Sequence, residues 1–306
     1  MNGIVRWLRS GRGLVPYAAC VLGFMVLVVL EGAIVRATGS GGGCGNHWPL
    51  CNGDFFPHHP RLATVIEYTH RSMSGVCGTL VAVLIAWVFA ARVKGDRVRR
   101  AAVWVGVLLL TEALLGAVLV KGGYVEKNAS DARVFMQCIH FTNTMLLVAA
   151  LTLTWWWLKP RLGAVAGVEA RSVAWLAVVA TIVVGATGSV AALADTLFPS
   201  PSLRAGLADD FSAAAPLLVR MRWVHPAAAL IGVVCVAWLC VRVRGGAARW
   251  LGWLMGLQLV LGVGDVLLLA PTWMQVLHLL GADLYWIALV VVASIVLPEK
   301  RASLRG

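Results

Sequence analysis

The stretch LVPYAACVLGFMVLVVLEGAIV, residues 14–35, carries one charged side chain, Glu31, and as a helix is long enough to cross the roughly 30 Å hydrocarbon core of a bilayer. Across all 306 residues 60% are hydrophobic and 13% are charged, about half the roughly 25% typical of soluble domains. Similar apolar runs follow at 63–91, 101–120, 133–158, 172–192, 218–241, 249–269 and 273–297. The sequence therefore predicts an all-α integral membrane protein with eight transmembrane helices surrounded by lipid.

Basic residues are concentrated on one side of these spans, whereas the last loop on the other side has none. Cytoplasmic loops of membrane proteins concentrate Lys and Arg, so we expect a multi-pass protein of the cell membrane with both termini cytoplasmic. The Lys and Arg residues of the cytoplasmic side then account for the net charge of +12, and no nucleic-acid partner is expected. The first span lacks a small-residue cleavage site and is expected to remain as an uncleaved anchor. The basic residues of the predicted inner side are Arg6, Arg9, Arg12, Arg92, Lys94, Arg97, Arg99, Arg100, Lys159, Arg161, Arg171, Arg242, Arg244, Arg249, Lys300, Arg301 and Arg305.

Four sequence features recur in the same order in the two halves of the chain. Because each half has an even number of spans, the copies run parallel, related by an axis along the membrane normal. We therefore predict two pseudo-symmetric four-helix bundles, formed by residues 1–160 and 161–306. The paired features are Ala-Thr-Gly-Ser at 37–40 and 186–189, expected at the outer ends of the first and fifth spans; Glu112 and Gln258, each four residues before Gly116 or Gly262; Met136-Gln137-x-x-His140 and Met274-Gln275-x-x-His278; and His70 and His225.

The duplication places four histidines near the outer ends of the even-numbered spans. A histidine within a membrane is costly unless it meets another polar group or serves a site, and four at matched positions favour a site. Two imidazoles from two helices can approach a planar macrocycle from both faces and ligate haem iron, so each half is predicted to hold one haem. Zinc is disfavoured, because two nitrogens leave its tetrahedral coordination unfinished. The four predicted iron ligands are His70, His140, His225 and His278.

The first outer loop contains two cysteines seven positions apart, Cys44 and Cys51, on either side of a Gly- and Pro-containing turn. On an oxidising outer side these residues are expected to form a disulfide, with two free thiols as the alternative. The remaining cysteines lie in or beside apolar spans and are interpreted as packing residues. The histidines of this loop, His47, His58 and His59, are interpreted as solvated or as loose metal contacts.

Glu67 precedes His70 by three residues and shares its helix face, whereas its counterpart in the second half is Arg222. One predicted haem thus has a carboxylate beside it, and the other has a guanidinium that can meet a haem propionate bidentately. This asymmetry favours one working site and one electron-transfer site. The alternative is that Glu67 merely pairs with Arg71 or Arg61 at the interface.

Arg36 and Arg71 are the propionate candidates in the first half, and ordinary interfacial snorkelling is their alternative interpretation. Glu31 and Glu112 fall inside apolar spans, so each is expected to be neutral, paired or functional.

With these residues the chain resembles the haem A synthase family of bacteria and mitochondria, whose members convert haem O to haem A. The resemblance covers essentially the whole chain. It is carried by Gly32-Ala33-x-Val35-Arg36-x-Thr38-Gly39-Ser40-Gly41, the Cys44…Trp48-Pro49-x-Cys51 loop, Glu67-x-x-His70-Arg71, Met136-x-x-x-His140, Trp223-x-His225 and Gln275-x-x-His278.

The resemblance implies an oxidoreductase with eight helices that oxidises the C8 methyl of haem O to a formyl group by successive hydroxylations, giving haem A for terminal oxidases. It implies that His225 and His278 ligate a resident haem b and that His70 and His140 hold the substrate. It further implies that Glu67 is the essential carboxylate and that Cys44 and Cys51 form the outer-loop disulfide.

The chain departs from the family pattern at three places. Glu112 stands where the family favours glutamine, and Glu31 is an unusual acid for its position. Some members have a second cysteine pair in the loop between the fifth and sixth spans, whereas residues 194–219 contain no cysteine here. Details of substrate entry are therefore not transferable from the family.

A C–H bond on the porphyrin rim is too inert for acid–base chemistry alone, so iron must supply the oxidising power and the protein supplies position and electron flow. Glu67 is then expected to move protons or to steady a cationic intermediate. Expected partners are haem O, a haem O synthase and an electron donor of unidentified nature. The alternatives are a bis-haem b-type membrane electron carrier and a haem-binding assembly protein, and Glu67 with the cysteine loop favours the synthase.

Overall fold

The computed structural model describes residues 9–160 and 168–297. Within these ranges the chain is helical and has no strand, and eight of its helices are long and apolar enough to cross a membrane. The predicted all-α class with eight spans is confirmed. The spanning helices are α2 (Leu14–Ala37), α3 (Leu62–Ala91), α4 (Arg97–Lys121), α5 (Asp131–Leu158), α6 (Val168–Leu197), α9 (Val224–Val243), α10 (Gly246–Leu267) and α11 (Thr272–Val296).

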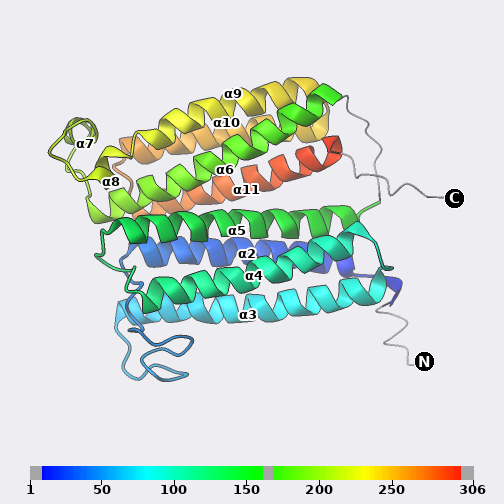
Figure 1. The fold of residues 1–306 in the computed structure, drawn as a ribbon, viewed down its shortest axis with the longest axis horizontal. Helices are drawn as coiled ribbons and strands as arrows, with labels where there is room; N and C mark the ends of the chain where they lie inside the picture. The colour runs from blue at the N-terminus through cyan, green and yellow to red at the C-terminus, as the bar shows by residue number, and fades with distance from the viewer. Residues whose placement is uncertain (1–8, 161–167, 298–306) are drawn as a thin grey trace.

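The helices of each half lie side by side and close a ring of neighbours (Figure 1). In the first half α2 contacts α3 and α5, and α4 lies between α3 and α5; in the second half α6 contacts α9 and α11, and α10 lies between α9 and α11. The rings meet where α2 and α5 contact α6 and α11. The pseudo-symmetry of the halves and their boundary at residue 160 stay predictions.

The connections that follow α2 and α6 lie at the same end of the molecule, opposite the start of α2 and the end of α11 (Figure 1). This arrangement agrees with an even number of spans. Several of the basic residues used to orient the chain lie outside the described residues, namely Arg6, Arg161, Lys300, Arg301 and Arg305.

The connection after α6 contains two short helices that the sequence did not predict, α7 (Leu203–Asp210) and α8 (Leu217–Arg220). The hydroxyl of Ser202 accepts a hydrogen bond from the backbone N–H of Ala205 at 3.2 Å, which caps the start of α7. A segment of eight residues with little apolar periodicity gives no clear helical signal, and the cap is its main local determinant.

The second Ala-Thr-Gly-Ser copy, residues 186–189, lies inside α6, which continues to Leu197. The first copy ends α2, with Thr38 as the C-cap and Gly39 at a φ of 65° beyond it. The prediction that both copies mark the outer end of a span was therefore wrong. A tetrapeptide of common small residues is too short to fix a structural equivalence.

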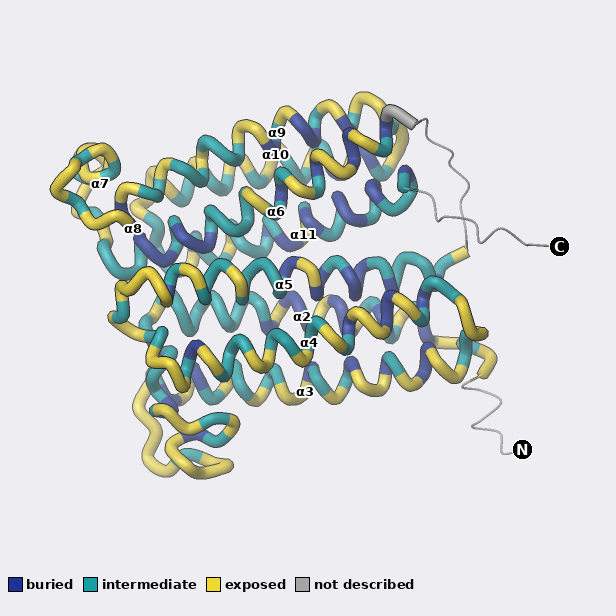
Figure 2. Tube along the Cα trace, viewed as in Figure 1, coloured by how far each residue is buried: buried dark blue, intermediate teal, exposed yellow. Residues whose placement is uncertain are grey.

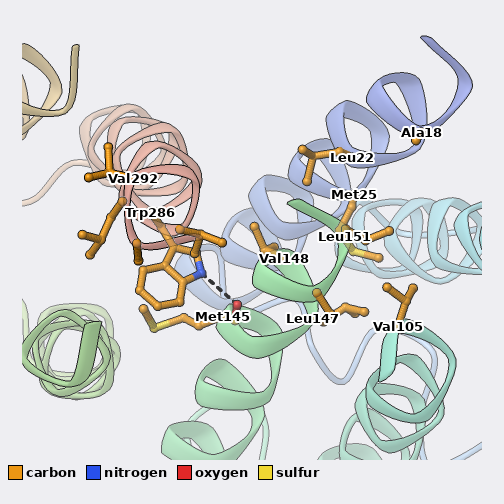
Figure 3. Close-up of a cluster of buried hydrophobic side chains, with 14 of the residues drawn as sticks. Ala18, Leu22, Met25, Val105, Met145, Leu147, Val148, Leu151, Trp286 and Val292 are labelled. Atoms are coloured by element: carbon orange, nitrogen blue, oxygen red, sulfur yellow. Dashed lines mark hydrogen bonds between the residues drawn. The ribbon is translucent and has the colours of Figure 1, made fainter. Parts of the chain in front are cut away.

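Buried apolar side chains form one main cluster, which draws on both halves of the chain. It lies largely toward the end of the molecule at which α2 begins and α11 ends (Figure 2). Trp286 of α11 joins the two rings there, because its Nε1–H donates to the carbonyl oxygen of Met145 on α5 at 2.8 Å (Figure 3). Large apolar residues on outward faces are exposed, among them Leu110 and Trp253. Such faces suit helices that contact lipid.

Candidate functional site

His225 on α9 and His278 on α11 face each other with ring centroids 6.4 Å apart and ring planes at 79°. A metal–nitrogen bond is about 2 Å, and a ring nitrogen lies about 1.2 Å from the ring centre, so two imidazoles on opposite sides of one metal stand about 6.4 Å apart. The spacing of the pair therefore fits an iron between the two rings. A bound haem would be ligated from both faces here.

The nitrogen Nδ1 of His225 is held by the backbone of α6. It lies 3.1 Å from the carbonyl oxygen of Val184. With Nδ1–H donating to that oxygen, the lone pair is on Nε2, the nitrogen then available to a metal. On the other side, Gln258 Nε2 of α10 lies 3.1 Å from Nδ1 of His278 and 3.3 Å from its Nε2, while Oε1 of Gln258 is buried without a hydrogen bond.

Each of the four predicted ligand histidines lies against a glycine on the preceding spanning helix. A side chain on three of these glycines would come within about 3 Å of the ring, which is closer than ordinary van der Waals contact. Gly32, Gly188 and Gly262 thus let three of the four rings lie directly on a helix backbone. The distances from an added Cβ to Cε1 are 3.0 Å for Gly32 and His70, 4.0 Å for Gly116 and His140, 2.9 Å for Gly188 and His225, and 3.0 Å for Gly262 and His278.

Sequence reasoning missed the two glycines Gly32 and Gly188 as partners of the histidines. It matched Gly188 with Gly39 through the repeated tetrapeptide, whereas the structure gives Gly32 the equivalent contact. The sequence spacing could have revealed the correspondence between the two glycines. Gly188 is 156 residues after Gly32, and His225 is 155 residues after His70.

His70 on α3 and His140 on α5 are the predicted ligands of the first half. Nδ1 of His70 is buried and makes no hydrogen bond of good geometry among the described residues, and the backbone of Val28 on α2 interacts with the ring. Nδ1 of His140 lies 3.4 Å from Oε1 of Glu112 on α4, which is an ion-pair distance without hydrogen-bond geometry. The structure thus shows a partner for Glu112, and the pairing of His70 with His140 stays a prediction. Glu31 remains partly exposed on α2.

Glu67 is 3% exposed and fastens the first outer loop to α3. Its Oε2 accepts the backbone N–H of Cys44 at 2.7 Å, and its Oε1 accepts Nη2 and Nε of Arg71 at 2.5 and 3.1 Å. Arg71 also holds the loop to α3, because its Nη1 donates to the carbonyl oxygens of His47 and Leu50 at 2.6 Å each. Glu67 therefore pairs with Arg71, and its catalytic role stays a prediction.

Cys44 and Cys51 form a disulfide with their Cα atoms 4.4 Å apart, and both residues are buried. The predicted pairing is confirmed. Next to it, Gly43 lies so close to the backbone of Ala63 and Thr64 that a side chain has no room, and Thr64 Oγ1 donates to the carbonyl oxygen of Gly43 at 2.8 Å. The loop histidines His47, His58 and His59 are exposed.

Arg222 fastens the outer connection of the second half. Its guanidinium donates to Asp210 at 2.8 Å, to Ser200 at 3.0 Å and to Asp195 at 3.2 Å. In each half, the residue three positions before a predicted ligand histidine anchors an outer connection. This residue is the carboxylate Glu67 before His70 and the guanidinium Arg222 before His225. The acids that meet Arg222 were not predicted, because Asp210 belongs to the unforeseen α7.

Arg36 reaches from α2 into the second half. Its Nη1 donates to Ala192 O of α6 and to Thr196 Oγ1, each at 2.6 Å, and its Nη2 donates to Gln275 Oε1 of α11 at 2.8 Å. Arg36 therefore joins the halves near His278. The propionate contacts of Arg36, Arg71 and Arg222 stay predictions.

Comparisons with known proteins show which family the chain belongs to. Residues 16–290 match the model of the cytochrome oxidase assembly protein family. A protein of Thermus thermophilus named protohaem IX farnesyltransferase is 40% identical over 295 residues, covering 92% of this chain and 48% of that protein. Proteins named haem A synthase in Geobacillus kaustophilus and Alkalihalophilus pseudofirmus are 34% and 37% identical over 46% and 42% of this chain, and 42% and 41% of theirs.

The chain thus spans about half the length of the Thermus relative, and its matches to the two haem A synthases cover less than half of either protein. The family match, in contrast, runs through nearly all eight spanning helices. The chain therefore belongs to the cytochrome oxidase assembly protein family, which confirms its recognition as a member of the haem A synthase family.

Proposed function

We propose that this chain is a haem A synthase, an oxidoreductase that converts the C8 methyl of haem O to a formyl group by two successive hydroxylations. The observation that carries the proposal is the 6.4 Å separation of the His225 and His278 rings, which fits bis-imidazole ligation. The family match and the relatives named haem A synthase support it.

In this proposal His225 and His278 hold a resident haem b, which supplies one-electron redox chemistry when bound. Val184 fixes the ring of His225 through its carbonyl oxygen, and Gln258 lies against the ring of His278. The carbonyl oxygen of Val184 sets the tautomer of the His225 ring, and both contacts hold a ligand ring in its orientation before the metal arrives. Arg222, with Arg36 and Arg71, is proposed as a propionate partner.

His70 and His140 are proposed to hold the substrate haem O in the first half. The disulfide loop lies at the outer end of this site and is fixed to α3 by Glu67 and Arg71. Oε2 of Glu67 accepts one N–H, from Cys44, and a carboxylate oxygen has a second lone pair. We propose that Glu67 takes up and returns a proton at this lone pair during oxidation of the methyl carbon.

Each hydroxylation replaces a C–H bond of the methyl group by a C–OH group. With dioxygen as the oxidant, one oxygen atom enters the methyl group, and the other leaves as water after taking up two protons and two electrons from the expected electron donor. The hydrate that results from the second hydroxylation loses water and leaves the formyl group.

A haem O synthase is proposed as the protein that supplies the substrate. The Thermus relative is named for farnesyl transfer to protohaem IX, and this chain accounts for only 48% of it. Farnesylation of protohaem IX gives the haem that this chain is proposed to oxidise. In the Thermus protein, a segment similar to this chain therefore belongs to the same polypeptide as about as much additional sequence. That protein is named for farnesylation, the reaction that would precede the proposed oxidation.

We further propose that the protein lies in the cell membrane with both termini cytoplasmic. The start of α2 and the end of α11 lie at one end of the molecule, together with the basic α3–α4 connection (Figure 1). The disulfide lies at the opposite end, which suits an oxidising exterior.

The test is to co-express the chain with a haem O synthase, purify it, extract its haems in acid and separate them by chromatography with mass detection. Haem A or its hydroxylated precursor beside haem B supports the synthase, and the His278→Ala variant should then lack haem B. Haem B alone, with haem O present in the cells, would overturn the proposal in favour of a bis-haem electron carrier. Bound haem O without any oxidised product would favour the assembly protein.

A further inference from the structure

We propose that Glu112 is the positioning residue of His140, and that the exchange of this carboxylate for the amide of Gln258 beside His278 gives the irons of the two halves different reduction potentials. The inference rests on the proposed function, since it takes His140 and His278 as iron ligands. It concerns an acid that departs from the family pattern and that the proposed reaction does not otherwise use.

Glu112 stands beside His140 at the place that the supporting partner of a metal ligand would take. Oε1 of Glu112 lies 3.4 Å from Nδ1 of His140, and that nitrogen is buried without another partner among the described residues. Histidines that bind metals almost always donate their second ring N–H to a carboxylate, a carbonyl or water. Glu112 is placed to accept it after a small rotation of either side chain, leaving Nε2 for the iron.

The Glu112 carboxylate is itself held in place by α5. Its Oε2 accepts Nδ2 of Asn143 at 2.6 Å, and its Oε1 accepts the hydroxyl of Thr144. Asn143 is fixed in turn by Thr111, whose hydroxyl donates to its Oδ1 at 2.8 Å, and by the carbonyl oxygen of Leu108 at 2.9 Å. A carboxylate within a membrane span is costly unless such donors compensate it. The network thus fixes the carboxylate beside His140.

The second half repeats the arrangement without the charge. Gln258 stands four residues before Gly262, which backs His278, as Glu112 stands four residues before Gly116, which backs His140. Gln258 Nε2 lies 3.1 Å from Nδ1 and 3.3 Å from Nε2 of His278, so each side chain lies beside the ring of its histidine. The amide N–H donates to a ring nitrogen, whereas the carboxylate of Glu112 accepts from one.

This difference in charge has a direct consequence for the two irons. A carboxylate that accepts the Nδ1–H raises the basicity of the ligand and adds a negative charge near the metal, whereas an amide adds none. Both effects favour the more positive, oxidised iron. The iron of the first half should therefore have the lower reduction potential, a property of the site in which the proposal places the oxidation.

The experiment is a reciprocal exchange, Glu112→Gln and Gln258→Glu, in the full chain purified and loaded with haem B as the probe. Potentiometric titration followed by absorbance measures the midpoint of each haem, and His140→Ala and His278→Ala assign the two components. Glu112→Gln should raise the midpoint of the first-half component and weaken its haem binding by about 10–100-fold. Gln258→Glu should lower the midpoint of the second-half component.

Thr154→Val is the control, because the Thr154 hydroxyl donates to the carbonyl oxygen of Ala150 in its own helix and its loss leaves Glu112 and the donors of Glu112 in place. It should leave both midpoints unchanged. The inference is overturned if Glu112→Gln changes neither midpoint nor haem affinity, or if Thr154→Val shifts the midpoint equally. If His140→Ala removes no haem component, His140 is not an iron ligand and the proposed function is wrong at that point. Failure of the Glu112→Gln prediction alone would overturn only the inference about Glu112.

Discussion

The ring of His225 lies so close to Gly188 that a Cβ on that glycine would come within 2.9 Å of its Cε1. We expect Gly188→Ala to displace the ring and to lower the haem b content of the purified protein several-fold. Folding should persist, because alanine is favoured over glycine inside a helix by about 1 kcal/mol. Haem per polypeptide, measured from the pyridine haemochrome spectrum, checks the prediction.

Two other glycines provide the controls. Gly116→Ala introduces a Cβ at 4.0 Å from His140, an ordinary contact, and Gly252 has no heavy atom of the described residues within 4 Å of such a Cβ. Both variants should retain their haem. Equal haem loss in all three variants would show that haem b retention does not depend on the close approach of His225 to Gly188.

Glu67→Ala should do more than remove a proton acceptor. It leaves the buried N–H of Cys44 and the guanidinium of Arg71 without their partner, and breaking a buried ion pair costs about 3–5 kcal/mol. Glu67→Gln retains an acceptor for the Cys44 N–H and should keep the loop in place while stopping oxidation.

The susceptibility of the Cys44–Cys51 disulfide to a membrane-impermeant reductant separates the two roles of Glu67. We expect fast reduction in Glu67→Ala and slow reduction in both Glu67→Gln and the parent protein. Full synthase activity in Glu67→Gln would leave Glu67 as an anchor of the loop alone.

Removal of the disulfide by Cys44→Ser and Cys51→Ser should destabilise the protein by about 2–3 kcal/mol, the chain-entropy contribution of so short a closed loop. The effect should appear as a lower midpoint of thermal unfolding in detergent. Since the pair lies in the first half, the haem b component should be unaffected. Cys77→Ser, at a buried cysteine that forms no disulfide, provides a comparison in which a reductant causes no further change.

Arg36→Lys should weaken the contact between the halves even though the charge is kept. A guanidinium satisfies Ala192, Thr196 and Gln275 at once, and a single ammonium on a flexible stem cannot reproduce that geometry. We expect a lower unfolding temperature and, because Gln275 lies one turn before His278, an altered absorbance of the haem in the second half. Arg9→Lys, at an exposed position at the start of the described chain, should change neither.

The membrane spans and the approach of His225 to His278 were predictable because hydropathy and an internal repeat are properties of the sequence itself. The eight spans agree with the helices to within a few residues, and His225 and His278 do face each other. The contacts that support them were not predictable, because Gly32 and Val184 meet their histidines across a helix interface that no local pattern encodes. Glu112 was recognised as an unusual acid, but its bonds to Asn143 and Thr144 required the relative rotation of α4 and α5.

The position of Arg36 bears on how such a two-part protein can arise. If Gly32 corresponds to Gly188, then Arg36 corresponds to Ala192, the residue whose carbonyl oxygen it contacts. A symmetric pair of identical first halves would bring two guanidiniums together at this point in a medium of low dielectric constant, where like charges repel strongly. The two halves differ at this position, with Arg36 in the first and Ala192 in the second. A homodimer assembled from the first half alone would therefore need a different residue in place of Arg36.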